Sequence, residues 1–134
     1  MNLTEIFNFL KSHKNVALAT VEEGYPKIRV FQIMGQEENV LYFSTSASKA
    51  VYRQLLKNPF VELLVWNENI SVRMVGTVNF NMDDHTKKKI HTDNSVLQRL
   101  YDDYRKPVYF SLPISELDYY NLTLTPPVLE HFKF

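Results

Sequence analysis

Hydroxyl groups and one ammonium group are concentrated where a predicted strand, 40–45, gives way to a predicted helix, 49–57. The side chains that carry them are Ser44, Thr45, Ser46, Ser48 and Lys49. The free amides and the dipole at the start of a helix favour an anion, and these side chains would add hydrogen bonds and positive charge. The stretch therefore predicts a site for a dianionic phosphate. The alternative is that the serines only cap the helix.

Arg29 is the second candidate anion-binding residue. It lies inside a predicted strand, 27–34, between Ile28 and Val30. A strand arginine usually reaches solvent, but its planar fork can also bind a buried anion through paired hydrogen bonds. If this strand neighbours the helix that Lys49 begins, Arg29 and Lys49 would form a two-sided clamp for a phosphate.

Other catalytic and metal-binding patterns are not visible in the sequence. The chain has no cysteine, no serine lies in a Gly-x-Ser-x-Gly elbow, and the 3 glycines fit neither a Walker loop nor a dinucleotide fingerprint. No metal site is predicted either, because no i, i+4 pair occurs among the histidines His13, His85, His91 and His131. A bound phosphate would therefore be held mainly by side chains.

Length and composition predict one domain over residues 1–134. Hydrophobic residues make up 45% and charged residues 22%, values typical of a globular protein. The 15 basic residues cancel the 15 acidic ones, so charge gives no drive toward nucleic acid or anionic lipid. No export signal or membrane span is visible, and the lack of cysteine fits the cytoplasm.

The spacing of apolar residues predicts the elements that must position these side chains. Helices are expected over 3–10, with Asn2 and Glu5 as caps, over 49–57, and over 83–104 with a break near 93–95. Strands are expected over 16–21, 27–34, 40–45, 61–66, 70–80, 108–112 and 117–124. Six or seven short strands flanked by helices predict a mainly β, antiparallel barrel. Gly76 predicts a bulge, and no structure is assigned to 128–134.

Short motifs follow one another along the chain from about residue 15 to 124. They are Ala19-Thr20-Val21, Gly24-x-Pro26, Ile28-Arg29-Val30-Phe31, Leu41-Tyr42-Phe43-Ser44-Thr45, Ser48-Lys49, Gln54-Leu55, Lys57-Asn58-Pro59 and Val72-Arg73-Met74-Val75-Gly76. This ordered set resembles the pyridoxamine 5′-phosphate oxidase family of FMN-binding split barrels. The sequence is most similar to its short single-domain members, of the general-stress and nitroimidazole-reductase-like kind.

The resemblance implies a split-barrel homodimer with one FMN in each of two clefts at the interface. Its phosphate would be held by Arg29 and Lys49 together with hydroxyl groups of Ser44, Thr45, Ser46 or Ser48. The flavin ring would lie beside the backbone of Val30, Phe31 and Gln32, and would be faced from the second subunit by Trp66 and Ser71. Arg73 matches a family position with either an interface or a cofactor role.

The resemblance also implies an FMN-dependent oxidoreductase, in which NAD(P)H or another donor reduces the flavin and an unidentified small molecule reoxidises it. Such a flavoprotein needs mainly position and polarity from its side chains, so no catalytic residue is assigned. Oxidation of pyridoxamine phosphate is not expected. The full oxidases carry arginine and histidine in an extended C-terminal segment, where this chain has Glu130-His131-Phe132-Lys133-Phe134.

Two other functions stay open at the level of sequence. One is a flavin or haem protein without turnover, acting in storage, sensing or electron transfer; the family also includes deazaflavin binders. The other is an oligonucleotide-binding barrel, but such grooves need a positive track and the net charge is +0. The 9 Phe, 8 Tyr and 1 Trp are expected mostly in the core.

Overall fold

Eight strands and four helices follow one another in the computed structural model, which describes residues 1–134. Their bounds are α1 (Leu3–Ser12), β1 (Asn15–Glu22), β2 (Tyr25–Gln32), β3 (Gly35–Glu37), β4 (Val40–Thr45), α2 (Ala50–Lys57), β5 (Phe60–Asn67), β6 (Ile70–Thr77), α3 (Asp84–Asp93), α4 (Ser95–Leu100), β7 (Val108–Asn121) and β8 (Val128–Lys133). None of these helices is long and apolar enough to cross a membrane.

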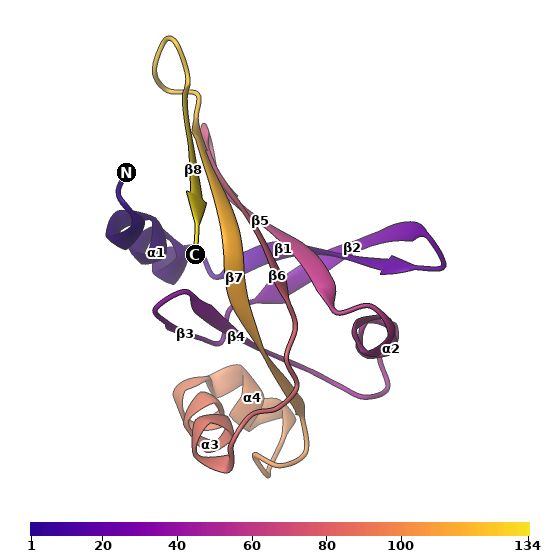
Figure 1. Ribbon diagram of the computed structural model, residues 1–134. Helices are drawn as coiled ribbons and strands as arrows, with labels where there is room; N and C mark the ends of the chain where they lie inside the picture. Colours follow the sequence, from indigo (N-terminus) through magenta and orange to yellow (C-terminus); the bar gives the residue numbers. More distant parts are fainter.

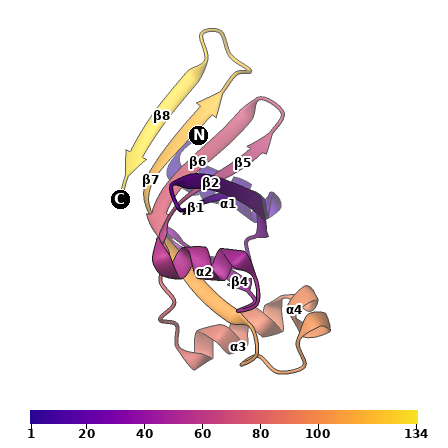
Figure 2. The same cartoon turned by 90° about the vertical axis from the view of Figure 1, so that its right-hand side faces the viewer.

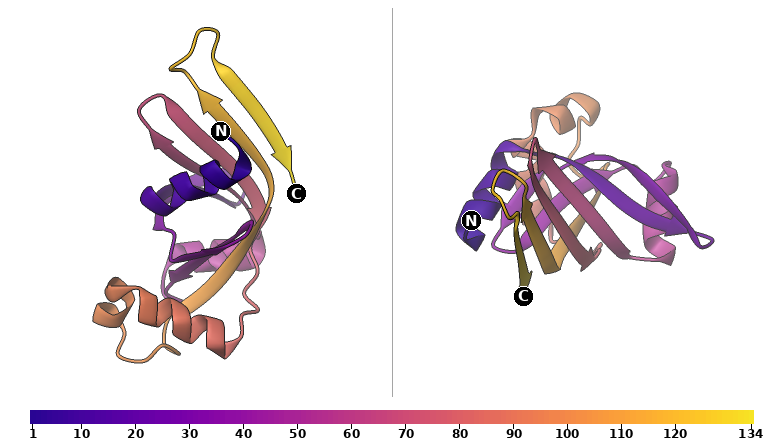
Figure 3. Two further views of the ribbon diagram at one scale, coloured as in Figure 1. Left: turned by 90° about the vertical axis from the view of Figure 1, so that its left-hand side faces the viewer. Right: turned by 90° about the horizontal axis from the view of Figure 1, so that it is seen from above.

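The strands form one antiparallel sheet in the order β2-β1-β5-β6-β7-β4-β3, with β8 also paired to β7 (Figure 1). β7 is the longest strand, and two partners follow each other along one of its edges. β4 pairs with its first half, up to Pro113, and β8 pairs with its second half, from Glu116. β6 and the bridge at Asn79 occupy the opposite edge. The sheet therefore divides along β7 and curls into a half-barrel, which confirms the predicted fold class (Figures 2 and 3).

Three details of the predicted strands were wrong. The two strands predicted over 108–112 and 117–124 are one continuous strand that ends at Asn121, with Pro113 at the point where the partner of β7 changes from β4 to β8. The segment 128–133, left without structure, pairs with β7 as β8. Gly35–Glu37, which lies outside every predicted strand, pairs with β4 as β3. β3 and β8 are each held by pairing with the neighbouring strand, β4 and β7, and local propensity alone does not report such pairing.

The interior of the half-barrel is filled mainly by valine, leucine and isoleucine side chains, and it includes a cluster of three phenylalanines. The rings of Phe43 and Phe110 stack at 5.3 Å, and Phe31 contacts both edge-on at 5.9 and 5.8 Å. α1 adds Ile6 and Leu10 to the same core, and its start is closed by the expected capping box of Asn2 and Glu5. Fewer aromatic residues lie in the core than expected: the buried ones are Phe31, Phe43, Tyr109, Phe110 and Tyr119, whereas Tyr25, Phe60, Trp66, Tyr120 and Phe134 are exposed.

Gly76 sits at the predicted bulge, where the register of β6 against β7 shifts between Val75 and Gly76. A Cβ atom there would lie 2.3 Å from the Pro113 carbonyl oxygen, which is backbone and cannot move aside cheaply. Gly76→Ala is therefore expected to lower the free energy of unfolding by about 3 kcal/mol. Denaturant unfolding monitored by Trp66 fluorescence measures this. The control is Gly35→Ala, whose Cβ would meet only the Tyr42 ring at 3.1 Å and should cost much less.

The outer face is the side of the sheet that points away from the hydrophobic core. Register places Val30, Ala17 and Leu64 side by side on this face, and alternation adds the neighbours two residues along each strand. Its exposed apolar side chains are Ile28, Val30, Leu64, Trp66, Tyr120 and Leu129. Several exposed apolar side chains gathered on one face of a sheet are typical of a protein–protein interface.

Charged groups occupy the rest of the outer face, centred on Asp118. His131 Nδ1 contacts its carboxylate at 2.6 Å and Arg73 Nη2 at 3.4 Å. The hydrogen bond from His131, and then that from Arg73, hold the pKa of Asp118 below its ordinary value of 3.8. Glu62, Glu116 and Lys133 complete the cluster through ion pairs of 3.5 to 3.8 Å.

A lowered pKa means that the Asp118 carboxylate stabilises the folded state above its ordinary pKa of 3.8 and loses this effect as the pH falls through the folded value. Asp118→Asn is expected to cost at most about 1 kcal/mol at about pH 5, because the pair is partly solvated. The difference from the wild-type protein should shrink as the pH falls below 3.8. Thermal unfolding of both proteins across this range tests it, and a constant difference would contradict the pairing.

Candidate functional site

Arg29 of β2 points toward α2 and the core side of the sheet, since it lies opposite buried Leu18. Its Nη1 donates to the Leu18 carbonyl at 3.0 Å and its Nη2 to Gln54 Oε1 at 2.8 Å. Both acceptors are neutral, and the guanidinium forms no ion pair with a carboxylate. Partial burial lowers the pKa of Arg29, because water is withdrawn from the charged form. The side chain is thus a half-buried cation without a counter-ion.

The stretch between β4 and α2 supplies the second half of the candidate site. Lys49 is the N-cap of α2 and makes no side-chain cap hydrogen bond. Ser46 and Ser48 bond each other, with their hydroxyl oxygens 2.9 Å apart, and both are near the surface. The start of α2 therefore keeps amides available for an external acceptor.

Thr45 and Ser44 differ in whether their hydroxyl groups have a hydrogen-bond partner. Thr45 is 5% exposed, and its Oγ1 is buried without a hydrogen-bond partner. Ser44 Oγ donates to the Val108 carbonyl at 3.1 Å, so its proton is already used. An unpaired buried hydroxyl is costly to leave unsatisfied, so the observed one fits a site that is completed by a bound ligand.

α2 links Arg29 to Lys49. Gln54, which binds Arg29, lies five residues after Lys49 on the same helix, a rise of about 7.5 Å. The helix packs beside β1 in Figure 2. Arg29 therefore contacts the helix that Lys49 begins.

The residues expected beside a flavin ring lie on the outer face or on β2, and their side chains are not gathered around Arg29 and Lys49. Val30 is 69% exposed and points outward, Gln32 is exposed, and Phe31 is buried in the core, so only its backbone is available. Trp66 and Ser71 are register partners on β5 and β6 and share the outer face. A single chain therefore does not bring Trp66 and Ser71 together with Arg29 and Lys49.

The sequence interpretation assigned no role to Gln54, although it was part of a quoted motif. The signal was available: Gln54 falls on the same face of α2 as Val51 and Leu55, and all three are buried. A polar side chain on the apolar face of a short helix needs internal partners. Its other partners, Thr20 and Glu22, come from β1.

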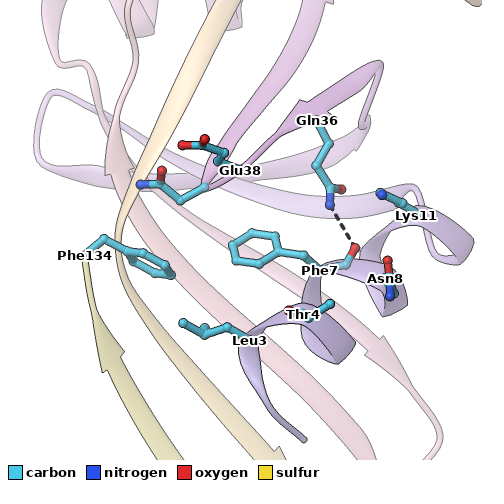
Figure 4. Close-up of a pocket in the computed structure, with 9 residues that line it drawn as sticks. Leu3, Thr4, Phe7, Asn8, Lys11, Gln36, Glu38 and Phe134 are labelled. Carbon is cyan, nitrogen blue, oxygen red and sulfur yellow. Dashed lines mark hydrogen bonds between the residues drawn. The ribbon is translucent and has the colours of Figure 1, made fainter.

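A pocket of about 390 Å³ lies elsewhere, between α1 and the turn that joins β3 to β4 (Figure 4). Gln36 Nε2 donates there to the Phe7 carbonyl at 2.9 Å, while Gln36 Oε1 is buried without a partner. None of the predicted site residues lines this pocket. No group of three or more His, Asp or Glu side chains is placed to hold a metal ion.

The sequence and fold of this chain both have known relatives. The model of the family described as pyridoxamine 5′-phosphate oxidase matches residues 3–109. This span runs from α1 into the start of β7 and includes every predicted site residue. A comparison with curated proteins gave no match.

Solved structures share the fold over nearly the whole chain. A Clostridium acetobutylicum protein related to general stress protein 26 is 23% identical, with a TM-score of 0.80 over 98% of this chain and 94% of the other. General stress protein 26 from Bacillus anthracis is 21% identical, with a TM-score of 0.80 over 100% of both chains. An FMN-binding pyridoxamine 5′-phosphate oxidase-related protein from Nostoc punctiforme is 16% identical, with a TM-score of 0.70 over 98% and 95%. At these identities the likeness shows a common fold.

Proposed function

The chain belongs to the pyridoxamine 5′-phosphate oxidase family, and we propose that it binds FMN and acts as an oxidoreductase on a small molecule. The observation that carries the proposal is the half-buried Arg29 guanidinium, whose partners are both neutral. A buried cation is normally paired, so this one favours an anionic ligand. The FMN-binding relative from Nostoc punctiforme supports a flavin as that ligand.

The residues of the site fit the phosphate of FMN. Arg29 can supply N–H groups that its protein partners leave free, Lys49 can supply an ammonium, and Thr45 a hydroxyl that has no partner within the chain. The uncapped start of α2 adds amide donors and its dipole. Ser46 and Ser48 complete the set through exposed hydroxyl groups.

We further propose that the protein is a homodimer that holds FMN between its subunits. The exposed apolar side chains of the outer face support this, since a second copy of the chain would cover them. In such a dimer Trp66 and Ser71 of one subunit face the flavin bound by Arg29 and Lys49 of the other. The backbone of residues 30–32 lies beside the ring edge.

Bound FMN would supply the redox chemistry, since a flavin can accept and release a hydride. The chain itself would bind the phosphate, orient the ring and exclude water from the interface. NAD(P)H is the proposed electron donor, and the acceptor is an unidentified small molecule.

Anaerobic reduction of the FMN-loaded protein by NADPH or NADH tests the oxidoreductase role. The flavin's visible absorption should disappear at a rate that saturates with the donor, and should return when oxygen or a nitroaromatic acceptor is added. Free FMN mixed with the same donor is the control. A protein that binds FMN but is reduced no faster than this control is a flavin carrier or sensor and not a reductase.

A further inference from the structure

We propose that Gln54 is a positioning residue that leaves Arg29 without a carboxylate partner, and that this makes the site select phosphorylated flavin over riboflavin. The inference rests on the proposed function and extends it to the basis of cofactor selection. It concerns a side chain that touches Arg29 and is not itself placed against the flavin.

Gln54 is 5% exposed, and both ends of its amide form hydrogen bonds. Its Oε1 accepts from Thr20 Oγ1 at 2.6 Å and from Arg29 Nη2 at 2.8 Å. Its Nε2 donates to Glu22 Oε2 at 2.6 Å. The amide orientation is fixed by these contacts, because a rotated amide would set its N–H group against the Arg29 guanidinium and its oxygen against the Glu22 carboxylate.

Glu22 is the carboxylate that would otherwise be available to Arg29. Gln54 stands between them and binds one carboxylate oxygen, while Arg53 Nη2 contacts the other at 2.7 Å. The negative charge of Glu22 is thus paired with Arg53 at the surface. The hydrogen bonds from Arg53 and then Gln54 lower the pKa of Glu22, which keeps it ionised and bound there.

As a result, the Arg29 guanidinium has no carboxylate in contact and can pair with an external anion. A guanidinium has five N–H donors, and protein acceptors take two of them here. A phosphate can accept from the remainder, and its attraction to Arg29 is not reduced by a carboxylate in direct contact. Riboflavin has the same ring without the phosphate, so the ratio of the two affinities reports on the charge that Arg29 presents.

The decisive variant moves the carboxylate from position 22 to position 54. The double variant Glu22→Gln with Gln54→Glu keeps the net charge and nearly the same volume, and gives Arg29 a carboxylate in direct contact. Its FMN affinity should fall by about tenfold to a hundredfold, with riboflavin affinity unchanged. Gln54→Glu alone should have the same effect on FMN affinity. It also places the new carboxylate against that of Glu22, and this repulsion could disturb folding. The double variant avoids it because position 22 is then neutral. Gln98→Glu on α4, away from the site, is the control and should keep the wild-type ratio.

Fluorescence titration with FMN and with riboflavin gives the ratio, and circular dichroism confirms that each variant folds. An unchanged ratio in a folded double variant overturns the role of Gln54. If the wild-type protein binds neither flavin, the proposed function fails, and binding of inorganic phosphate measured by 31P NMR line broadening decides the inference alone. Phosphate bound by the wild-type protein and lost in the double variant supports it. Equal binding, or none in either protein, overturns it.

Discussion

Replacing Arg29 by alanine is expected to weaken FMN binding by about tenfold to a hundredfold, because a hydrogen bond to a charged group contributes about 1.5 to 3 kcal/mol. Riboflavin affinity should change little. Lys49→Ala should act in the same direction and by a similar factor, since it removes the second cation of the clamp. Calorimetric titration of each variant with both flavins measures the effects.

Two further variants distinguish loss of the Arg29 contact from a general loss of positive charge. Arg99 on α4 is exposed and forms no ion pair, so Arg99→Ala is a matched control that should bind FMN like the wild-type protein. Arg29→Lys keeps the charge and loses the planar fork, and should recover only part of the affinity. Unchanged FMN affinity in both Arg29→Ala and Lys49→Ala would remove the assignment of the phosphate site.

Placing a carboxylate on the outer face is expected to dissociate the proposed dimer. Ile28 is 71% exposed in the single chain and belongs to the apolar patch on that face. Ile28→Asp should have little effect on the folding of one chain, because surface substitutions usually cost less than about 0.5 kcal/mol. In the dimer it would bury an unpaired charge, which raises the dissociation constant by at least about a hundredfold.

Light scattering coupled to size-exclusion chromatography gives the mass, and the absorption of the same peak gives the bound FMN. Both should fall together in Ile28→Asp, because each proposed cleft needs two subunits. Leu100→Asp is the control, since Leu100 is 63% exposed on α4 and lies outside the outer face. A monomeric Ile28→Asp protein that still binds FMN with the wild-type affinity would show that one chain makes the whole site.

The main elements could be predicted from the sequence because their signals are local. The apolar spacing of residues 3–10 reports α1, and the β-branched and aromatic run 40–45 has the same bounds as β4. A glycine within a strand pattern predicts a bulge, and Gly76 confirms this because its position allows no side chain. β8 was missed because 128–133 has few apolar residues to alternate, and its strand conformation depends on pairing with β7.

The candidate site shows the same limit. Arg29 and Lys49 could be named from residue type and neighbouring elements, since a phosphate site requires cations and a helix start. Gln54 could not be given its role, because that role depends on β1 and β2 lying across from α2 with Thr20, Glu22 and Arg29 in reach of one amide. Such a network becomes visible only in three dimensions.

The most direct test of FMN binding is a visible absorption spectrum of the purified protein, recorded as isolated and again after addition of FMN and desalting. Mass spectrometry identifies whatever compound heat releases. The expected result is a flavin spectrum at about one FMN per chain, with FMN as the released compound. A protein that stays colourless after FMN is added, or that carries haem instead, would contradict the proposed function.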